Sequence, residues 1–263
     1  MDIQHKTIWI TGASSGIGAG LASALASQGA RLVLSARSED KLRLLKESLR
    51  KSDSHYIAPL DLANHDSIRS ACDDILGQGI EIDMLINNGG VSQRGLVRDI
   101  ALSVHRNVME VNYFGTIALT QMLLPNLLKN HGKVVNIASV AGKVGGQSMS
   151  GYAGSKHALI GFMDCLRAEE EQNGLTVLNV CPGFVQTNIS RNALTADGSR
   201  FGEMAESIAN GISVEQCTSA IIKAIKKEQR EIIIGTGLSG WAPFIKRFFP
   251  NLLMTLAARK NIR

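Results

Sequence analysis

The chain has 263 residues, of which 44% are hydrophobic, 19% are charged and 5 are proline, the composition of an ordinary globular protein. These proportions exclude disordered, collagen-like and low-complexity proteins. The formal net charge of +5 comes entirely from the segment after Glu231, which holds five basic residues and no acidic one. A basic excess confined to the tail argues against a nucleic-acid-binding face on the body, so no nucleic-acid partner is expected.

The cysteines and the N-terminus carry no signal for export or for metal binding. The four cysteines lie far apart and form no Cys-x-x-Cys pair, and none has paired histidines at zinc spacing. We therefore expect reduced, buried thiols and no metal site. Residues 1–6 lack the basic and then apolar pattern of a signal peptide, so a cytoplasmic protein is the expectation.

Short apolar runs alternate with longer amphipathic stretches from one end of the chain to the other. Strands are predicted at 7–11, 31–35, 56–60, 84–87, 133–139, 176–181 and 231–235, and helices at 18–28, 39–51, 65–76, 103–129, 152–171 and 214–226. This alternation predicts a doubly wound α/β fold, with helices on both faces of a seven-stranded parallel sheet. No Gly-, Pro- or Ser-rich linker divides the chain, so residues 1–263 are expected to form one domain.

The first predicted strand runs directly into the segment Thr11-Gly12-Ala13-Ser14-Ser15-Gly16-Ile17-Gly18, which opens into an Ala-rich helix. Gly12 can take the turn, Gly16 lets the backbone approach a pyrophosphate, and Gly18 permits close packing of the helix on the strand. The N-terminus of the helix adds free N–H groups and a positive dipole end. The segment therefore predicts a phosphate cradle for a dinucleotide rather than a simple turn.

The end of the second predicted strand, Ser35-Ala36-Arg37, bears on which dinucleotide binds. An acidic residue at this place would hold the ribose 2′-hydroxyl of NAD and repel a 2′-phosphate. Ala36 leaves space and Arg37 offers a permanently charged, bidentate fork, so NADP(H) is favoured over NAD(H). The alternative is a solvated Arg37 that two nearby acidic residues neutralise.

A possible acid–base group follows the fifth predicted strand, where Ser139 is succeeded by Tyr152 and Lys156 at positions i and i+4 of a helix. This spacing puts the tyrosine and the lysine on one helix face. The lysine ammonium is expected to lower the pKa of the phenol toward working pH, as a tyrosine acid or base requires. Ser139 could then hydrogen-bond a substrate carbonyl. Alone, Tyr-x-x-x-Lys also fits a surface tyrosine stacked on a lysine stem.

Together these residues resemble the short-chain dehydrogenase/reductase family over about residues 6–235. The motifs that match in order and spacing are the glycine segment 11–18, Asn87-Asn88-Gly89-Gly90, Asn112, Ser139, Tyr152-x-x-x-Lys156 and Pro182-Gly183. The resemblance implies a Rossmann-type fold, a bound nicotinamide cofactor and an oxidoreductase that acts on CH–OH groups. It also implies a homodimer or homotetramer formed through the helices that hold Asn112 and Tyr152.

The same resemblance assigns roles to individual residues. The implied catalytic residues are Asn112, Ser139, Tyr152 and Lys156. Tyr152 would donate a proton to the carbonyl oxygen and Ser139 would steady that oxygen, while Lys156 would also bind the ribose and Asn112 would hold a helix kink and a water. The residues expected to contact the cofactor are Gly12, Ser14, Ser15, Gly16, Ile17, Gly18, Arg37, Asp61, Leu62, Asn88, Gly89, Tyr152, Lys156, Pro182, Gly183, Val185 and Thr187, with Asn87 beside it.

Two positions depart from the pattern of the family. Gly89 stands where the family usually has alanine, which removes no chemistry but adds chain entropy that folding must overcome. Ser15 stands where many NADP-preferring members have a basic residue, so Arg37 alone supports that preference.

Three further segments, 111–116, 155–158 and 192–200, resemble a subgroup of the family called dehydrogenase/reductase member seven B. Its vertebrate members are membrane-associated and linked to lipid ketones, which implies a reductase of a lipophilic carbonyl. The expected function is therefore NADPH-dependent reduction of a ketone or aldehyde to the alcohol. The alternatives are an NAD-dependent alcohol dehydrogenase and a redox-sensing module that binds NADP(H) without chemistry.

The long connection 183–211 is expected to form a lid over the substrate. Arg191 and Arg200 within it are interpreted as solvated rather than as an anion site. The residues expected to line the pocket are Asn188, Ile189, Leu194, Phe201 and Met204, together with Val91, Gln93, Val144 and Met149.

The tail, residues 238–263, combines four aromatic residues with Lys246, Arg247, Arg259, Lys260 and Arg263. This composition resembles an interfacial segment on anionic lipid, which would give a cytoplasmic protein a peripheral membrane contact. The alternative is packing over the pocket or against another subunit. The sequence favours that alternative, because Pro243 and Pro250 interrupt any long helix.

Overall fold

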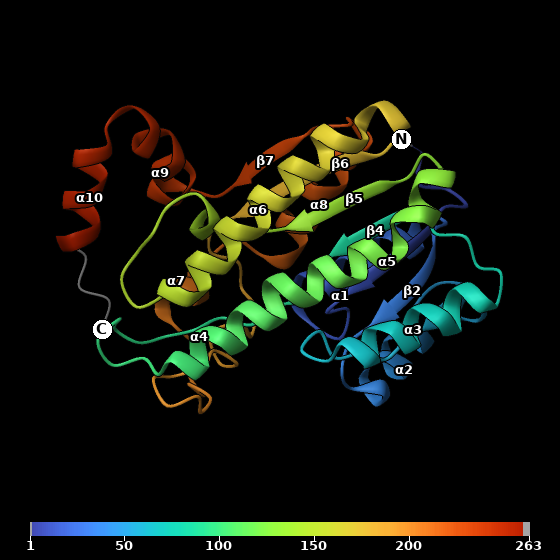
Figure 1. The fold of residues 1–263 in the computed structure, drawn as a ribbon, viewed down its shortest axis with the longest axis horizontal. Coiled ribbons are helices and arrows are strands. Elements are labelled where there is room, and N and C mark those ends of the chain that lie inside the picture. The colour runs from blue at the N-terminus through green and yellow to red at the C-terminus, as the bar shows by residue number, and fades with distance from the viewer. Residues whose placement is uncertain (1, 260–263) are drawn as a thin grey trace.

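A computed structural model describes residues 2–259 (Figure 1). The described residues form a sheet of seven parallel strands in the order β3-β2-β1-β4-β5-β6-β7. The strands are β1 (Thr7–Thr11), β2 (Arg31–Ser35), β3 (Tyr56–Ile57), β4 (Met84–Asn87), β5 (Lys133–Ile137), β6 (Thr176–Pro182) and β7 (Glu231–Ile234). The predicted fold class, a doubly wound α/β sandwich with a seven-stranded parallel sheet, is confirmed.

Helices cover both faces of the sheet (Figure 1). One face packs against α1 (Gly16–Ser27), α2 (Glu39–Ser48) and α8 (Val214–Lys226), and the other against α3 (His65–Gly77), α5 (Gly115–Lys129) and α6 (Ser150–Glu170). The strands are buried on both faces, which explains why they read as continuous apolar runs without alternation. Trp9 on β1 is fully buried, and its indole N–H donates a hydrogen bond to Ser35 Oγ at 2.8 Å.

Several element ends differ from the prediction. The strand expected at 56–60 is reduced to β3, although the N–H groups of Ala58 and Leu60 still donate to the carbonyls of Leu34 on β2 and of Ala36 just after it. The helix expected at 103–129 is divided into α4 (Leu102–Met109), a π-helical turn (Glu110–Phe114) and α5. Short 3₁₀ turns lie at Ser52–Ser54, Val140–Gly142 and Glu171–Asn173. Cys165 is exposed, so the prediction that all four thiols are buried is wrong there.

The C-terminal tail forms two helices that stand beside the end of the sheet (Figure 1). Helix α9 (Gly237–Phe248) continues through Pro243, and α10 (Pro250–Arg259) begins at Pro250. Proline suits a first helical position because its N–H is not needed there. Lys260 and Arg263 of the same basic tail lie outside the described residues. Within residues 2–259, no helix combines the length and the apolar character needed to span a membrane.

The close packing of α5 against the loop after β3 requires a glycine at position 115. A Cβ at Gly115 would lie 1.9 Å from the carbonyl oxygen of Leu62, so Gly115→Ala forces backbone apart. We expect it to lower the free energy of unfolding by about 2 kcal/mol in urea denaturation.

Gly161→Ala on the exposed side of α6 is the matched control. There a Cβ would meet no atom of residues 2–259 within 4 Å, and the better helix propensity of alanine should raise stability by about 0.5–1 kcal/mol. A Gly115→Ala protein as stable as the wild type would contradict the close approach of α5.

Candidate active site

A cavity of about 300 Å³ opens at the carboxyl edge of β4, β5 and β6. Segments that follow these strands form its floor and sides, including Asn88 after β4, Ser139 after β5 and Pro182 at the end of β6. Helix α6 contributes Tyr152 and Lys156, and α9 and α10 close the far side. In parallel sheets the loops at the carboxyl ends of the strands are the usual place for a ligand.

Tyr152, Lys156 and Ser139 meet on the wall of this cavity. Ser139 caps the 3₁₀ turn that follows β5 by accepting a hydrogen bond from Ala141 N at 3.0 Å, and its hydroxyl donates to the carbonyl oxygen of Pro182 at 3.4 Å. The Lys156 ammonium lies 5.9 Å from the centroid of the Tyr152 ring. Its Nζ donates to the carbonyl oxygen of Ile137 at 2.8 Å. The predicted tyrosine, lysine and serine are therefore brought together.

The protonation of this group differs from the sequence-based expectation. Burial raises the pKa of Tyr152, and the hydrogen bond from Ser139 only partly opposes that shift. Burial lowers the pKa of Lys156 to about 8. The expectation that the lysine lowers the pKa of the phenol is wrong here, because its ammonium faces the ring and the Ile137 carbonyl. The phenol is neutral at physiological pH and so is a proton donor.

Asn112 lies in the π-helical turn between α4 and α5 and is fully buried. Its side-chain oxygen accepts from Val91 N at 2.8 Å, and its amide nitrogen donates to Val91 O at 2.8 Å and Ser155 Oγ at 3.0 Å. One side chain thus ties the loop after β4 to the kinked helix and to α6, one residue before Lys156. π-Turns in helices are frequent at functional sites.

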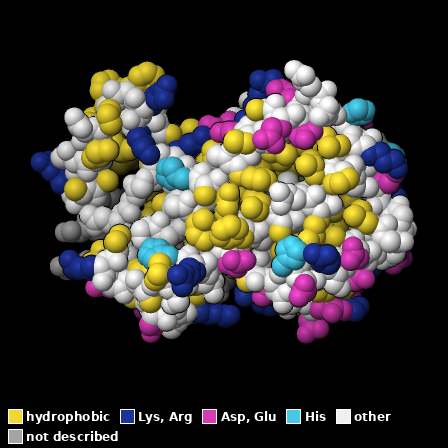
Figure 2. All heavy atoms as spheres, viewed as in Figure 1, with side chains coloured by type: hydrophobic (Ala, Val, Ile, Leu, Met, Phe, Trp, Pro, Cys, Tyr) yellow, Lys and Arg dark blue, Asp and Glu magenta, His cyan; other side chains and the backbone are white. Residues whose placement is uncertain are grey.

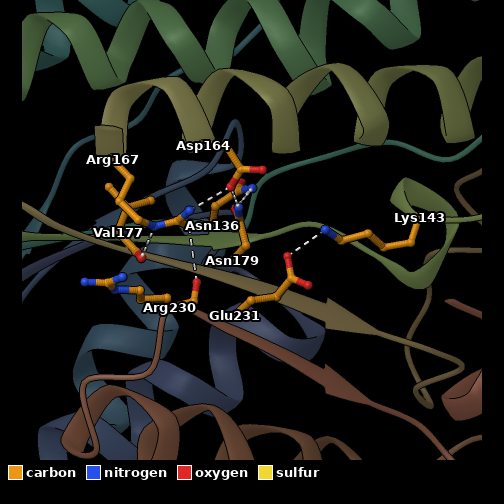
Figure 3. Close-up of polar contacts among 8 residues, drawn as sticks. All are labelled: Asn136, Lys143, Asp164, Arg167, Val177, Asn179, Arg230 and Glu231. Carbon is orange, nitrogen blue, oxygen red and sulfur yellow. Dashed lines mark hydrogen bonds and ion pairs between the residues drawn. The ribbon is translucent and has the colours of Figure 1, made fainter. Parts of the chain in front are cut away.

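A polar network fixes α6 on the sheet (Figure 3). Arg167 pairs with Asp164 at 2.8 Å and donates to Val177 O on β6 at 3.2 Å. Asp164 accepts from Asn179 at 3.0 Å, and Asn136 on β5 donates to Asn179 at 3.0 Å. Because the network joins the helix to two neighbouring strands, it restrains the helix that carries Tyr152 and Lys156.

The glycine segment after β1 interlocks with the loop after β4. Asn88 Nδ2 donates to the carbonyl oxygens of Thr11 and Gly12 at 3.0 and 3.2 Å, and Thr11 Oγ1 accepts from the N–H groups of Asn88 and Gly89. Gly12 has a φ of 63°, and a Cβ there would lie 2.8 Å from Gly89 Cα. A side chain at position 12 would therefore collide with the backbone of the loop after β4, which explains the glycine there.

The N-terminus of α1 opens toward the cavity. Gly16 has a φ of 55°, which only glycine adopts readily, and Ile17 lines the cavity. Within residues 2–259 the Ser15 side chain caps no N–H of this helix, whereas Asn64 caps α3 and Ser213 caps α8. Uncapped N–H groups at a glycine-rich turn are the donors that a phosphate needs, so the residues present fit a dinucleotide.

The other predicted cofactor residues fall into two groups. Those that line the cavity, besides Ile17, Asn88, Tyr152 and Lys156, are Pro182, Gly183, Val185 and Thr187. Those outside its lining are Gly12, Ser14, Ser15, Gly16, Gly18, Arg37, Asp61, Leu62 and Gly89, which follow β1, β2, β3 and β4 at the same edge of the sheet. Asn87 is turned away, because its amide donates to Thr120 in the core, so its predicted contact is not supported.

The predictions for the substrate pocket are correct only in part. Ile189, Val144 and Met149 line the cavity. Leu194, Met204, Asn188, Val91, Gln93 and Phe201 do not. The Gln93 amide is used to hold the Gly95 and Ser148 carbonyls and the Gly151 N–H, and the Phe201 ring stacks under Arg94 at 4.5 Å.

Several lining residues were missed by sequence reasoning. They come from the lid and the C-terminal helices and are Phe184, Ile208, Leu238, Ala242, Leu253 and Leu256. For the four residues from the C-terminal helices, the only sequence signal was the concentration of apolar residues in the tail. Arg191 and Arg200 are exposed and outside the cavity lining, in agreement with their interpretation as solvated.

Comparison with known proteins identifies the family. The sequence profile described as short chain dehydrogenase matches residues 6–198. The chain belongs to the short-chain dehydrogenase family. Dehydrogenase/reductase SDR family member 7B of Bos taurus is 38% identical over 98% of this chain and 82% of its own length. The Danio rerio protein of that name is 38% identical over 99% of this chain and 88% of its own.

Solved structures of the short-chain dehydrogenase family share the fold. A short chain dehydrogenase from Burkholderia cenocepacia J2315 in complex with NADP superposes with a TM-score of 0.81 at 25% identity, over 99% of this chain and 100% of its own. A short chain dehydrogenase/reductase from Burkholderia phymatum in complex with NAD superposes with a TM-score of 0.82 at 23% identity, over 100% of this chain and 98% of its own. The family therefore uses either NAD or NADP, and this short-chain dehydrogenase is an oxidoreductase by membership.

The buried ammonium of Lys156 predicts a pH-dependent effect on stability. Between about pH 8 and 10.5, the unfolded chain keeps a proton on this lysine that the folded chain has released, so this group makes folding more favourable as pH rises. At neutral pH it opposes folding. Lys156→Met should therefore raise the free energy of unfolding at neutral pH by about 1–3 kcal/mol.

The measurement is urea denaturation of both proteins across that pH range. The advantage of the variant should shrink as pH rises through the window, because the wild-type lysine becomes neutral. An advantage that is absent at neutral pH, or that does not change with pH, would contradict the assigned protonation.

Proposed function

We propose that the protein reduces a lipophilic ketone or aldehyde to the alcohol with NADPH as the reductant. The observation that carries the proposal is the Tyr152 phenol, which lies with Ser139 and Lys156 on the wall of one cavity. The names of the curated relatives, dehydrogenase/reductase, support this class of reaction.

The chemistry divides between the cofactor and the chain. When bound, the nicotinamide supplies the hydride that the carbonyl carbon receives. The neutral Tyr152 phenol donates its proton to the carbonyl oxygen, and the Ser139 hydroxyl donates a hydrogen bond to the same oxygen. Solvent returns the proton to the phenolate that remains, and the Lys156 ammonium, 5.9 Å from the centroid of the Tyr152 ring, would bind the ribose of the cofactor. Asn112 holds the loop after β4 against α6 through its bonds to Val91 and Ser155, which keeps the helix that carries Tyr152 in place.

The preference for NADPH depends on the end of β2. Arg37 is exposed there and Ala36 is small, whereas an enzyme selective for NAD would have an acidic residue at this edge. The uncapped N-terminus of α1 would bind the pyrophosphate, and Asp61 and Leu62, which follow β3, would contact the adenine end.

The cavity supports an apolar substrate. Its lining is dominated by side chains such as Val144, Met149, Ile189 and Leu253, with few polar groups apart from those of the proposed chemistry. A volume of about 300 Å³ lies at the small end of ligand sites. Residues 183–211 act as the lid, since Phe184, Thr187 and Ile208 cover one side.

Assembly as a homodimer or homotetramer is part of the proposal. Phe114 is half exposed at the start of α5, and Tyr113 packs edge-on against it and against Phe162 of α6, with ring centroids 5.1 and 6.4 Å apart. An exposed aromatic cluster on neighbouring helices is a suitable self-complementary face.

Removal of the Tyr152 hydroxyl tests the acid. Tyr152→Phe should lower kcat for NADPH-dependent reduction of lipophilic ketones by about a hundredfold or more, because in the proposed mechanism only Tyr152 transfers a proton to the carbonyl oxygen. NADPH binding, followed by nicotinamide fluorescence, should stay at the wild-type level. Tyr56→Phe, on β3, is the matched control and should be fully active; turnover retained by Tyr152→Phe would remove the proposed acid.

Replacement of Arg37 tests the choice of cofactor. Arg37→Gln should weaken NADPH binding about tenfold or more and leave NADH binding unchanged, because it removes a charged hydrogen bond to the 2′-phosphate. Arg43→Gln, which breaks a surface pair with Glu39, is the control and should bind both as the wild type does. A wild type that prefers NADH would contradict the assignment. It would favour the alternative of an NAD-dependent alcohol dehydrogenase, which agrees with the lack of a basic residue at Ser15.

A further inference from the structure

Helices α9 and α10 have an inner face that belongs to the cavity. Ala242 and Leu253 are buried and pack against Val140, next to Ser139. Leu238 and Leu256 also line the cavity, yet 48% and 38% of their surfaces are exposed. The apolar lining of the cavity is therefore continuous with the outer surface of these helices.

Polar contacts attach the two helices to the loop after β5. Lys246 Nζ on α9 donates to the Lys143 carbonyl at 2.8 Å, and Gln147 donates to the carbonyls of Ala257 and Ala258 at the end of α10. The side chain of Lys143 in turn pairs with Glu231 on β7 at 2.6 Å (Figure 3). The helices are thus held on the body in a fixed orientation, and their outer face is directed to solvent.

That outer face is strongly apolar. In residues 2–259, eight of the fourteen large hydrophobic side chains that are exposed lie between Leu238 and Leu256. Trp241, Phe244 and Phe248 form one stripe along α9, with successive ring centroids 6.0 and 4.6 Å apart. A concentration of exposed aromatic residues on one element marks an interaction surface.

The charges on these helices have one sign. Lys246, Arg247 and Arg259 are exposed, and the sequence contains no acidic residue after Glu231. Figure 2 shows hydrophobic and basic side chains side by side on the lobe that α9 and α10 form at the left of the molecule. Aromatic residues flanked by lysine and arginine match the interface of an anionic bilayer, where rings enter the headgroup region and bases contact phosphates.

We propose that the outer face of α9 and α10 docks on an anionic lipid surface, with the open side of the cavity next to the bilayer. A second copy of the chain is a poorer occupant, because a two-fold contact would set this basic face against itself. The docked orientation gives an apolar substrate a path from lipid to cavity past Leu238 and Leu256; this path, unlike the docking itself, rests on the proposed function.

The test is sedimentation of the full chain with vesicles, in the absence of cofactor. The partition coefficient should be about tenfold or more higher on phosphatidylcholine mixed with phosphatidylserine than on phosphatidylcholine alone, and should fall as salt is raised. The triple variant Trp241→Ser, Phe244→Ser, Phe248→Ser should lose about tenfold or more of the binding to the mixed vesicles.

A matched control replaces equally exposed apolar residues elsewhere, as Leu44→Ser, Val97→Ser, Leu102→Ser, with exposures of 66%, 70% and 63% against 63%, 50% and 60% on α9. It should bind vesicles as the wild type does. Both variants should keep the wild-type thermal unfolding temperature, because the substituted side chains lie on the surface.

Three outcomes would overturn the proposal. The first is equal binding of the α9 variant and the wild type to the mixed vesicles, and the second is equal wild-type binding to both kinds of vesicle. The third is a wild-type oligomer, measured by light scattering, that the α9 variant dissociates without a change in vesicle binding, which would assign the face to a subunit contact. NADPH titration of the same proteins tests the cofactor assignment separately, so failure of the docking and failure of the proposed function are distinguishable.

Discussion

The strand order of the parallel sheet decides where every functional group of this molecule lies. β1 lies between β2 and β4, and the chain leaves it toward β2 on one side before it returns to β4 on the other. The loops after β1 and β4 therefore diverge to opposite faces and meet only at their origins, where Thr11, Asn88 and Gly89 hold them together. Because all strands are parallel, the loops after β5 and β6 end at the same edge and complete the cavity.

Burial gives the site its rigidity and sets its protonation. From its π turn, Asn112 uses both its amide oxygen and its amide nitrogen in hydrogen bonds to Val91 and Ser155. The same exclusion of water keeps the Tyr152 phenol neutral and opposes the charge on Lys156. The buried charge of Lys156 thus lowers the stability of the fold at a residue that the proposed chemistry needs, a common feature of active sites.

The sequence predicted the structure correctly wherever the local residue pattern and the tertiary environment favour the same conformation. Buried parallel strands read as apolar runs, and the glycine segment has few other uses between a strand and a helix. The π turn at Asn112 was not predicted from the amphipathic period, because five residues are too short a segment to distinguish a wider turn from an irregular α-helical pattern. The direction of the Tyr152 pKa shift depends on where the Lys156 ammonium points, which spacing does not determine.

The C-terminal helices show a second kind of limit. Pro243 and Pro250 were good reasons to expect an interrupted tail, yet one proline is tolerated within α9 and the other starts α10. The resulting hairpin covers the cavity with one face and exposes the other, so the sequence-based alternatives of pocket packing and lipid contact need not exclude each other.

In the proposed mechanism, one cavity receives the reactive end of a nicotinamide cofactor beside the Tyr152 phenol. A crystal structure of the complex with NADP⁺ is the decisive experiment, since no substrate has to be known. We expect the pyrophosphate at the N-terminus of α1, the 2′-phosphate against Arg37 and the nicotinamide beside Tyr152 and Lys156. A nicotinamide outside the cavity, away from both side chains, would contradict it.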